Sequence, residues 1–255
     1  MAVAADTTRP DLSPKGGPSI LQKLRSFILS PRWLAIALAL LLWQLVAMQM
    51  NTRVVPPPAR VFSRLWEILS TGLFFEHLWA SMVRILSGFS ITLLVGAIVG
   101  VLMGSRRTWE ALFRDVVVLG LTMPGLIYAL LSVMFFGLSL LAPITAIVFA
   151  SYPFVAVNVR EGVRALDKDL LDMSRAYGVN RSKVVSSVIL PALLPFFLAA
   201  IRVGFAIAWK VSTLVEVFGA TSGVGFMIRS GFDSFSVPEI GAWALLFGGV
   251  MLLIE

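Results

Sequence analysis

The sequence predicts an all-α membrane protein with about six transmembrane helices. The chain has 255 residues, of which 58% are hydrophobic and only 14% are charged, whereas soluble domains average about 25% charged residues. The apolar residues fall in long blocks and not in the alternating pattern of a half-buried strand. A mean hydropathy of +0.90 fits the same class.

The composition also excludes several kinds of site. The chain has no cysteine, so disulfides, thiol catalysis and Cys-ligated zinc are ruled out. The single histidine, His77, cannot form a histidine metal site and is read as an interfacial polar residue. The scarcity of His, Cys and clustered acidic residues argues against a membrane-embedded enzyme. The net charge of +7 does not imply nucleic acid, because Lys and Arg accumulate in the cytoplasmic loops of membrane proteins.

The N-terminal region divides into two segments ahead of a transmembrane domain at 33–255. Residues 1–18 are rich in Pro, Ser, Gly and Thr and are predicted to be a disordered tail. Apolar residues at helical spacing within 19–32 predict a short amphipathic helix on the cytoplasmic membrane face. The alternative for 19–32 is a simple basic flank of the first span.

Six apolar segments are long enough to count as spans or nearly so. Their approximate bounds are 33–50, 82–104, 112–137, 140–157, 188–217 and 240–254. A short amphipathic helix is predicted at 61–69, within the polar connection after the first span. The last apolar run covers only 15 residues, against about 20 needed to cross hydrocarbon. We therefore expect a cytoplasmic tail beyond Glu255.

The distribution of basic residues orients the spans. An even number of spans places both ends of the chain on one side of the membrane. Of the 21 Lys and Arg residues, 14 fall in segments on the same side as the N-terminus. Because Lys and Arg are enriched in cytoplasmic loops, both termini and the basic segment at 158–187 are predicted to be cytoplasmic.

The basic segment carries the signals of a helix, a turn and a second helix. Apolar residues repeat at helical spacing within 166–177, at Leu166, Leu170, Met173 and Tyr177. Gly178 then provides the left-handed residue that ends a helix, and Asn180 is placed to cap the next one. This helix-turn-helix segment, called the elbow below, can transmit a movement of a soluble partner to the next span. The alternative is an ordinary interfacial loop.

A spacing motif in this segment resembles a known family. The motif begins with Asp172-Met173-Ser174 and reaches Gly178 after three further residues. Nine residues later it ends in an apolar run that closes with proline, Val188-Ile189-Leu190-Pro191. It resembles the coupling loop of ATP-binding cassette (ABC) importer permeases, whose pattern is Glu-Ala-Ala, three residues, Gly, nine residues and Ile-x-Leu-Pro. Met173 departs from the pattern, because it is bulkier than the family's alanine.

Other segments are similar to the sulfonate/nitrate/taurine branch of these permeases. They are His77–Phe89, Leu102–Gly104 and Val215–Met227, and the similarity covers roughly 54–254. The third span departs from the branch, since the Pro-rich stretch often found there is reduced to Met123-Pro124-Gly125.

The resemblance implies a type I ABC importer permease fold in the bacterial inner membrane, with a cytoplasmic coupling helix between spans four and five. It implies a dimer of two permease copies, a pair of ATP-binding subunits and an external solute-binding protein. ATP and Mg would be held by the partner, because this chain has no GxxxxGK[ST] motif and is expected to bind no cofactor or metal itself.

The cargo that the resemblance implies is a small anion such as a sulfonate, taurine or nitrate. The expected coupling residues are Leu170, Asp172, Met173, Ser174, Tyr177, Gly178, Leu190 and Pro191. The alternative is a stand-alone channel or an ion-coupled secondary transporter.

Four features within or next to the spans are candidates for packing or passage. Gly96, Gly100 and Gly104 form a small-residue ladder, either for packing inside the subunit or for a subunit interface.

Charges at membrane depth must face protein or water. Arg202, Lys210 and Glu216 are therefore candidates for the translocation pathway, or else for an ion pair and snorkelling side chains. Pro124 provides either a gating kink or an ordinary bend. The break Gly219–Gly225 is either an unwound pathway element or an external loop.

Overall fold

The computed structural model describes residues 31–50 and 54–254. The chain divides into two compact units, 1–58 and 59–255. The tail predicted for 1–18 and nearly all of the interfacial helix predicted for 19–32 lie outside the described residues. The last two residues of that predicted helix belong to α2.

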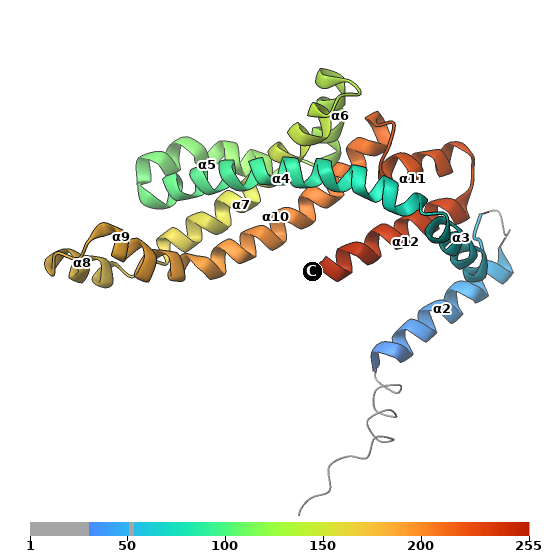
Figure 1. Ribbon diagram of the computed structural model, residues 1–255, viewed down its shortest axis with the longest axis horizontal. Helices are drawn as coiled ribbons and strands as arrows, with labels where there is room; N and C mark the ends of the chain where they lie inside the picture. Colours follow the sequence, from blue (N-terminus) through green and yellow to red (C-terminus); the bar gives the residue numbers. More distant parts are fainter. Residues whose placement is uncertain (1–30, 51–53, 255) are drawn as a thin grey trace, which may run out of the picture. The chain divides into compact units, whose positions relative to one another are not determined.

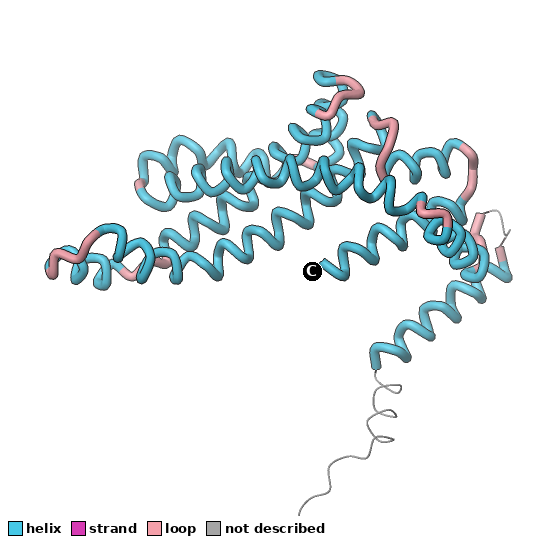
Figure 2. The backbone as a smooth tube through the Cα atoms, viewed as in Figure 1, coloured by secondary structure: helices cyan, strands magenta, loops and turns pink. Residues whose placement is uncertain are grey.

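Every regular element in 31–50 and 54–254 is a helix (Figures 1 and 2). The first unit holds α2 (Pro31–Gln49). The second unit holds, in chain order, α3 (Pro58–Ser70), α4 (Leu73–Ser105), α5 (Arg107–Thr122), α6 (Gly125–Phe136), α7 (Leu141–Arg164), α8 (Lys168–Ala176), α9 (Arg181–Val184), a π-helical turn (Val185–Ile189), α10 (Leu190–Gly219), α11 (Val224–Asp233) and α12 (Val237–Ile254).

Three long helices, α4, α7 and α10, form the centre of the second unit (Figure 1). Small side chains line the contacts between these helices and let their backbones approach closely. Close packing matters here because the hydrophobic effect does not drive helices together in lipid. One buried cluster joins α6, α7 and α10 and consists of Ala129, Ala142, Ala146, Ala150, Val211 and Val215. The helices α8 and α9 lie at one end of this unit and α11 at the other (Figure 1).

The glycine ladder of α4 faces α7 of the same chain. A Cβ atom added to Gly96 would lie 2.6 Å from the Val155 Cβ, and one on Gly104 would lie 2.6 Å from the Val163 Cβ. At Gly100 the added atom would lie 2.6 Å from the Ala156 carbonyl oxygen. The pairing advances in the same direction on both helices, so α4 and α7 run parallel in a fixed register.

The helices cover the predicted spans, with some boundaries moved. The second predicted span lies inside α4, which begins nine residues earlier than predicted, at Leu73. The fourth continues to Arg164, so the first part of the predicted coupling segment belongs to α7. The last begins at Val237 and reaches 18 residues. The amphipathic helix predicted at 61–69 is confirmed as α3.

The third predicted span is not one continuous helix. It begins at Arg107 as α5 and breaks after Thr122, and α6 leaves at an angle of 98°. In the described residues, four helices are long and apolar enough to cross a membrane, or five if this bent pair counts as one span; α2 supplies a shorter apolar helix. Because Pro124 lacks a backbone N–H and Met123 is extended, the helix cannot continue through this point.

Candidate functional site

Helix α8 is bounded by local capping interactions. The Asp167 carboxylate accepts hydrogen bonds from the backbone N–H groups of Asp169 at 2.9 Å and Leu170 at 3.4 Å, which satisfies donors at the helix start. At the other end Gly178 has φ +61°, a left-handed conformation that costs a side-chain-bearing residue energy. The Val179 N–H donates to the Ser174 carbonyl at 2.9 Å and completes the turn.

A continuous helical rod follows this turn. The Asn180 side chain accepts from the Ser182 N–H at 3.0 Å and starts α9. Helical structure then runs without interruption from Arg181 to Gly219, through the π-helical turn and into α10. Leu190 and Pro191 are the first two residues of α10 and directly follow the π-helical turn, where the regular i→i−4 hydrogen-bond ladder is already interrupted and a residue without an N–H is tolerated. At about 1.5 Å per residue the rod is about 58 Å long.

The apolar face of α8 is open. Leu170, Met173 and Tyr177 are all exposed, and Tyr177 retains 81% of its accessible surface. On the same helix Ser174 is buried and its hydroxyl donates to the Leu170 carbonyl at 2.7 Å. Asp172 lies off the apolar face and pairs with Arg175 at 2.7 Å. An exposed apolar stripe on a short, charged helix marks a surface that a partner can cover.

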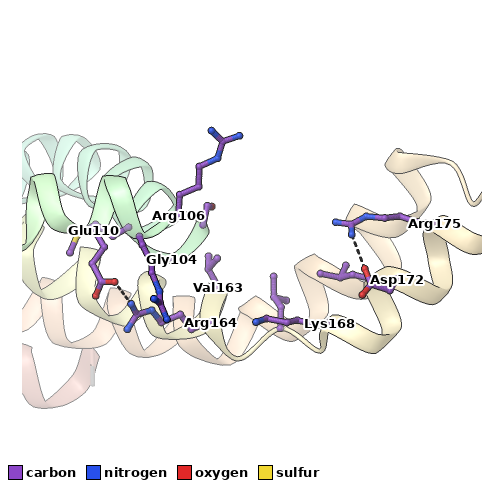
Figure 3. Close-up of a pocket in the computed structure, with 13 residues that line it drawn as sticks. Gly104, Arg106, Glu110, Val163, Arg164, Lys168, Asp172 and Arg175 are labelled. Carbon is purple, nitrogen blue, oxygen red and sulfur yellow. Dashed lines mark hydrogen bonds and ion pairs between the residues drawn. The ribbon is translucent and has the colours of Figure 1, made fainter.

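A cavity of about 710 Å³ separates α8 from the turn between α4 and α5 (Figure 3). Glu110, on α5, pairs with Arg164 at the end of α7, and Glu110 also lies 3.7 Å from Arg160. These ion pairs hold the ends of α5 and α7 together beside the cavity.

A buried ion pair joins α4 to α10 near the other end of the unit. The Glu216 side chain is 1% exposed, and Arg84 Nη1 lies 2.9 Å from its Oε1 atom. Ser81 donates to Glu216 Oε2 at 2.8 Å and the Gly225 N–H donates to the same oxygen at 3.0 Å. Arg84 was not among the site residues predicted from the sequence, although two opposite charges at membrane depth in different spans are the signal that could have paired Arg84 with Glu216.

The same cluster holds the loop between α10 and α11. Arg84 donates to the Ser222 carbonyl and to the Ser222 hydroxyl, each at 2.8 Å. The Gly223 N–H donates to Nδ1 of His77 at 3.1 Å, and the Val224 N–H donates to the Ser81 hydroxyl at 2.9 Å. The break predicted at Gly219–Gly225 is therefore a short, hydrogen-bonded connection, and His77 is one of its anchors.

The three charges predicted for the pathway are not brought together. Glu216 is enclosed by the ion-pair cluster. Lys210 is exposed on α10, and Arg202 lines a cavity of about 300 Å³ between α10 and α12. Arg202 and Lys210 are eight residues apart on α10, which places them about 12 Å apart along the helix axis. The structure thus separates Glu216 from the other two candidates and gives it a local partner.

Pro124 lies at the corner between α5 and α6. It is the N-cap of α6 and its carbonyl accepts from the Ile127 N–H at 2.9 Å. A Cβ atom added to the neighbouring Gly125 would lie 3.3 Å from Cγ2 of Val211 on α10. The corner therefore packs directly against the rod.

Comparison with known proteins gives consistent matches over most of the chain. The sequence profile of the family described as binding-protein-dependent transport system inner membrane component matches residues 92–254. The taurine transport system permease protein TauC of Escherichia coli (strain K12) is 29% identical, covering 92% of each chain. The bicarbonate transport system permease protein CmpB of Synechococcus elongatus (strain ATCC 33912 / PCC 7942 / FACHB-805) is 28% identical, covering all of this chain and 95% of its own.

The fold also matches a solved structure. A chain from inward-facing conformations of the MetNI methionine ABC transporter superposes with a TM-score of 0.57 and 22% identity. The match covers 75% of the present chain and 93% of the MetNI chain. At this identity the likeness concerns the fold alone.

Proposed function

The chain belongs to the binding-protein-dependent transport system inner membrane components, and from this premise we propose that it is the permease subunit of an ATP-driven importer of a small anion. The taurine permease among its relatives supports the sulfonate/nitrate/taurine branch that the sequence motifs indicated. Members of this family are transport proteins and not enzymes, so the proposed ATP hydrolysis takes place on a separate subunit that holds ATP and Mg.

The observation that carries the proposal is the exposed apolar face of α8 at the start of a continuous rod. In the proposed assembly Leu170, Met173 and Tyr177 seat in a cleft of the ATP-binding subunit, and burying them supplies the docking energy. Gly178 fixes the direction in which the chain leaves the docked helix. The basic residues around α8 support a cytoplasmic position for this end of the unit and for both termini.

Movement of the docked helix is passed on along the rod. Arg181–Gly219 is helical throughout, so a tilt imposed beside Gly178 reaches the far end of α10. The π-helical turn and Pro195 are the points where this rod bends most easily, because each interrupts the regular hydrogen-bond ladder. We propose that this tilt switches access between the two sides of the membrane.

The proposed cargo is a small anion, and the relatives support this class. TauC is described as a taurine permease and CmpB as a bicarbonate permease, and both solutes carry an anionic group. Two copies of the chain would enclose the pathway, with the exposed Lys210 and Arg202 of α10 facing it. An external solute-binding protein would deliver the cargo.

Reconstitution tests the proposal. Vesicles holding the chain, its ATP-binding subunits and the solute-binding protein should take up a labelled sulfonate, taurine, nitrate or bicarbonate only when ATP is supplied. Vesicles holding the chain alone should take up none. ATP-independent uptake by the chain alone would instead support the stand-alone channel or secondary transporter.

Replacing Met173 by glutamate should prevent docking. The substitution places a charge on the exposed apolar face of α8 that would have to be desolvated in the partner's cleft. We expect a loss of at least about tenfold in ATP-binding subunit recovered by co-purification, the factor that corresponds to about 1.4 kcal/mol. The control is Ser182→Glu, which adds the same charge to the exposed surface of α9 outside that face. Equal recovery with both variants would refute docking through this face.

Replacing Gly178 by valine should uncouple transport. A β-branched residue at φ +61° costs about 1–2 kcal/mol in the turn, so the chain leaves α8 in another direction. We expect ATP-driven uptake to fall while the chain still inserts. The control is Gly72→Val, because Gly72 has φ +75° with nothing near its Cβ position, as at Gly178, and lies in the turn between α3 and α4. Unchanged uptake in Gly178→Val would contradict the role of this turn.

A further inference from the structure

We propose that the cavity between the α4–α5 turn and α8 binds a phosphate-bearing anion, either the headgroup of an anionic phospholipid or a soluble phosphate compound. The placement of this cavity on the cytoplasmic face rests on the proposed function. Its volume of about 710 Å³ exceeds that of several water molecules at about 30 Å³ each. It therefore accommodates a phosphate group together with its substituents.

The charge of the lining favours an anion. Two acidic residues, Glu110 and Asp172, line the cavity, together with five basic residues: Arg106, Arg107, Arg164, Lys168 and Arg175. Both acids are already engaged, Glu110 with Arg164 and Asp172 with Arg175. Among the residues in 54–254, no ion pair or hydrogen bond is formed by the side chains of the three remaining cations. These three are Arg106, Arg107 and Lys168, and they give the cavity an uncompensated positive charge.

The three free cations line the cavity from separate elements. Arg106 and Arg107 belong to the turn between α4 and α5, whereas Lys168 is the first residue of α8. In Figure 3 Arg106 and Arg175 lie on opposite sides of the open space, with Arg106 extending upward and Lys168 lying lower down between the two sides. Arginine offers a planar fork of donors that matches phosphate oxygens, and lysine adds a point charge. One anion can thus contact both walls.

The start of α5 adds to the same field. Its N-cap is Arg106, whose side chain forms no capping hydrogen bond, so the first N–H groups of a sixteen-residue helix lack that partner. The positive end of the helix dipole favours a negative group nearby. This contribution reinforces the basic walls and does not replace them.

An anion bound here would bridge α8 to the α4–α5 turn. Lys168 lies at the start of the helix proposed to dock, while Arg106 and Arg107 belong to the membrane-embedded body. Occupancy would therefore favour one position of α8 relative to that body. A ligand with this preference shifts the population of coupling-competent conformations.

The test compares two variants that each remove two positive charges. Arg106→Gln with Lys168→Gln removes two of the three uncompensated positive charges of the cavity, and Arg181→Gln with Lys183→Gln removes two exposed positive charges of α9 outside it. The full-length chain is purified in detergent, alone and with its co-expressed ATP-binding subunits. One arm titrates inorganic phosphate. The other arm measures retention of phosphatidylglycerol against phosphatidylcholine by native mass spectrometry.

We expect the wild-type chain and the α9 variant to bind one of the probes, and the cavity variant to bind it about tenfold more weakly. Phosphate binding would identify a soluble ligand and selective phosphatidylglycerol retention a lipid headgroup. Equal binding by the two variants, or no binding of either probe to the wild-type chain, would overturn the proposal. Binding to the chain alone that disappears in the complex would also overturn it, in favour of an acidic segment of the ATP-binding subunit. Failure of those subunits to co-purify would count against the proposed function, while the measurements on the chain alone would still decide this site.

Discussion

Glu216→Ala is expected to destabilise the folded chain by about 3–5 kcal/mol, because it leaves the buried Arg84 guanidinium without its counter-charge. The Ser81 hydroxyl and the Gly225 N–H lose their acceptor at the same time. The connection between α10 and α11 is held by this cluster and should loosen with it. The measurement is unfolding of the purified chain by SDS in mixed micelles, with proteolysis at 220–223 as a local readout.

Two further variants separate the buried pair from a general effect of losing a carboxylate. Asp233→Ala removes the partner of Arg229 in an exposed ion pair and should cost at most about 1 kcal/mol. Replacing both Arg84 and Glu216 by methionine removes both buried charges and should recover part of the loss, since no buried charge is left without a partner, while the Ser81 hydroxyl and the Gly225 N–H still lack their acceptor. If Glu216→Ala were no more harmful than Asp233→Ala, the carboxylate would not be paired at depth as the structure shows.

Gly100→Leu is expected to prevent stable packing of α4 against α7. A Cβ atom at this position would lie 2.6 Å from the Ala156 carbonyl oxygen and 2.7 Å from the Val159 Cβ. The Ala156 carbonyl oxygen is a backbone atom, so a side-chain rotation cannot relieve this clash. The two helices would have to move apart as whole bodies. We expect a loss of about 3 kcal/mol, the upper end of the range for overpacking, seen as reduced membrane insertion yield and early unfolding in SDS.

Gly248→Leu is the matched control, because nothing lies within 4 Å of the Cβ position at Gly248 on α12. It adds the same side chain to a membrane helix and should leave the stability of the isolated chain almost unchanged. Wild-type behaviour of Gly100→Leu would show that the two helices do not meet along the glycine ladder.

Local signals predicted the elbow well, because helix ends depend on neighbouring residues. Gly178 and Asn180 each act within a few residues of their own position, and α8 ends and α9 begins where these two residues imply. The apolar spacing of Leu170, Met173 and Tyr177 likewise predicted a helix face. The spacing could not show that this face is open, since exposure depends on what the rest of the chain covers.

Long-range pairing was beyond the sequence pattern. Arg84 and Glu216 are 132 residues apart, and grouping Glu216 with Arg202 and Lys210 followed only from their position on one helix. Burial against α4 gave Glu216 a different partner. The glycine ladder left its partner open, although valines recur at the same four-residue spacing on α7, at Val155, Val159 and Val163. That matched spacing is the signal that could have paired the two helices.

The angle between α5 and α6 was also out of reach. Pro124 and Gly125 marked a bend, but a proline alone does not set a turn of 98°. The close approach of Gly125 to Val211 on α10 shows that packing against the rod accompanies the corner. The size of the bend is therefore a property of tertiary structure.

Because the helix from Arg181 to Gly219 is unbroken, the direction in which each of its side chains points depends on the number of residues between that side chain and the elbow. Adding one residue to its middle would turn everything beyond the insertion by about 100° and advance it by about 1.5 Å. Glu216 would then point away from Arg84 while the elbow kept its own geometry. Insertions or deletions of seven residues restore the phase almost fully, so length variation among natural or engineered versions should come in such steps or lie outside this segment.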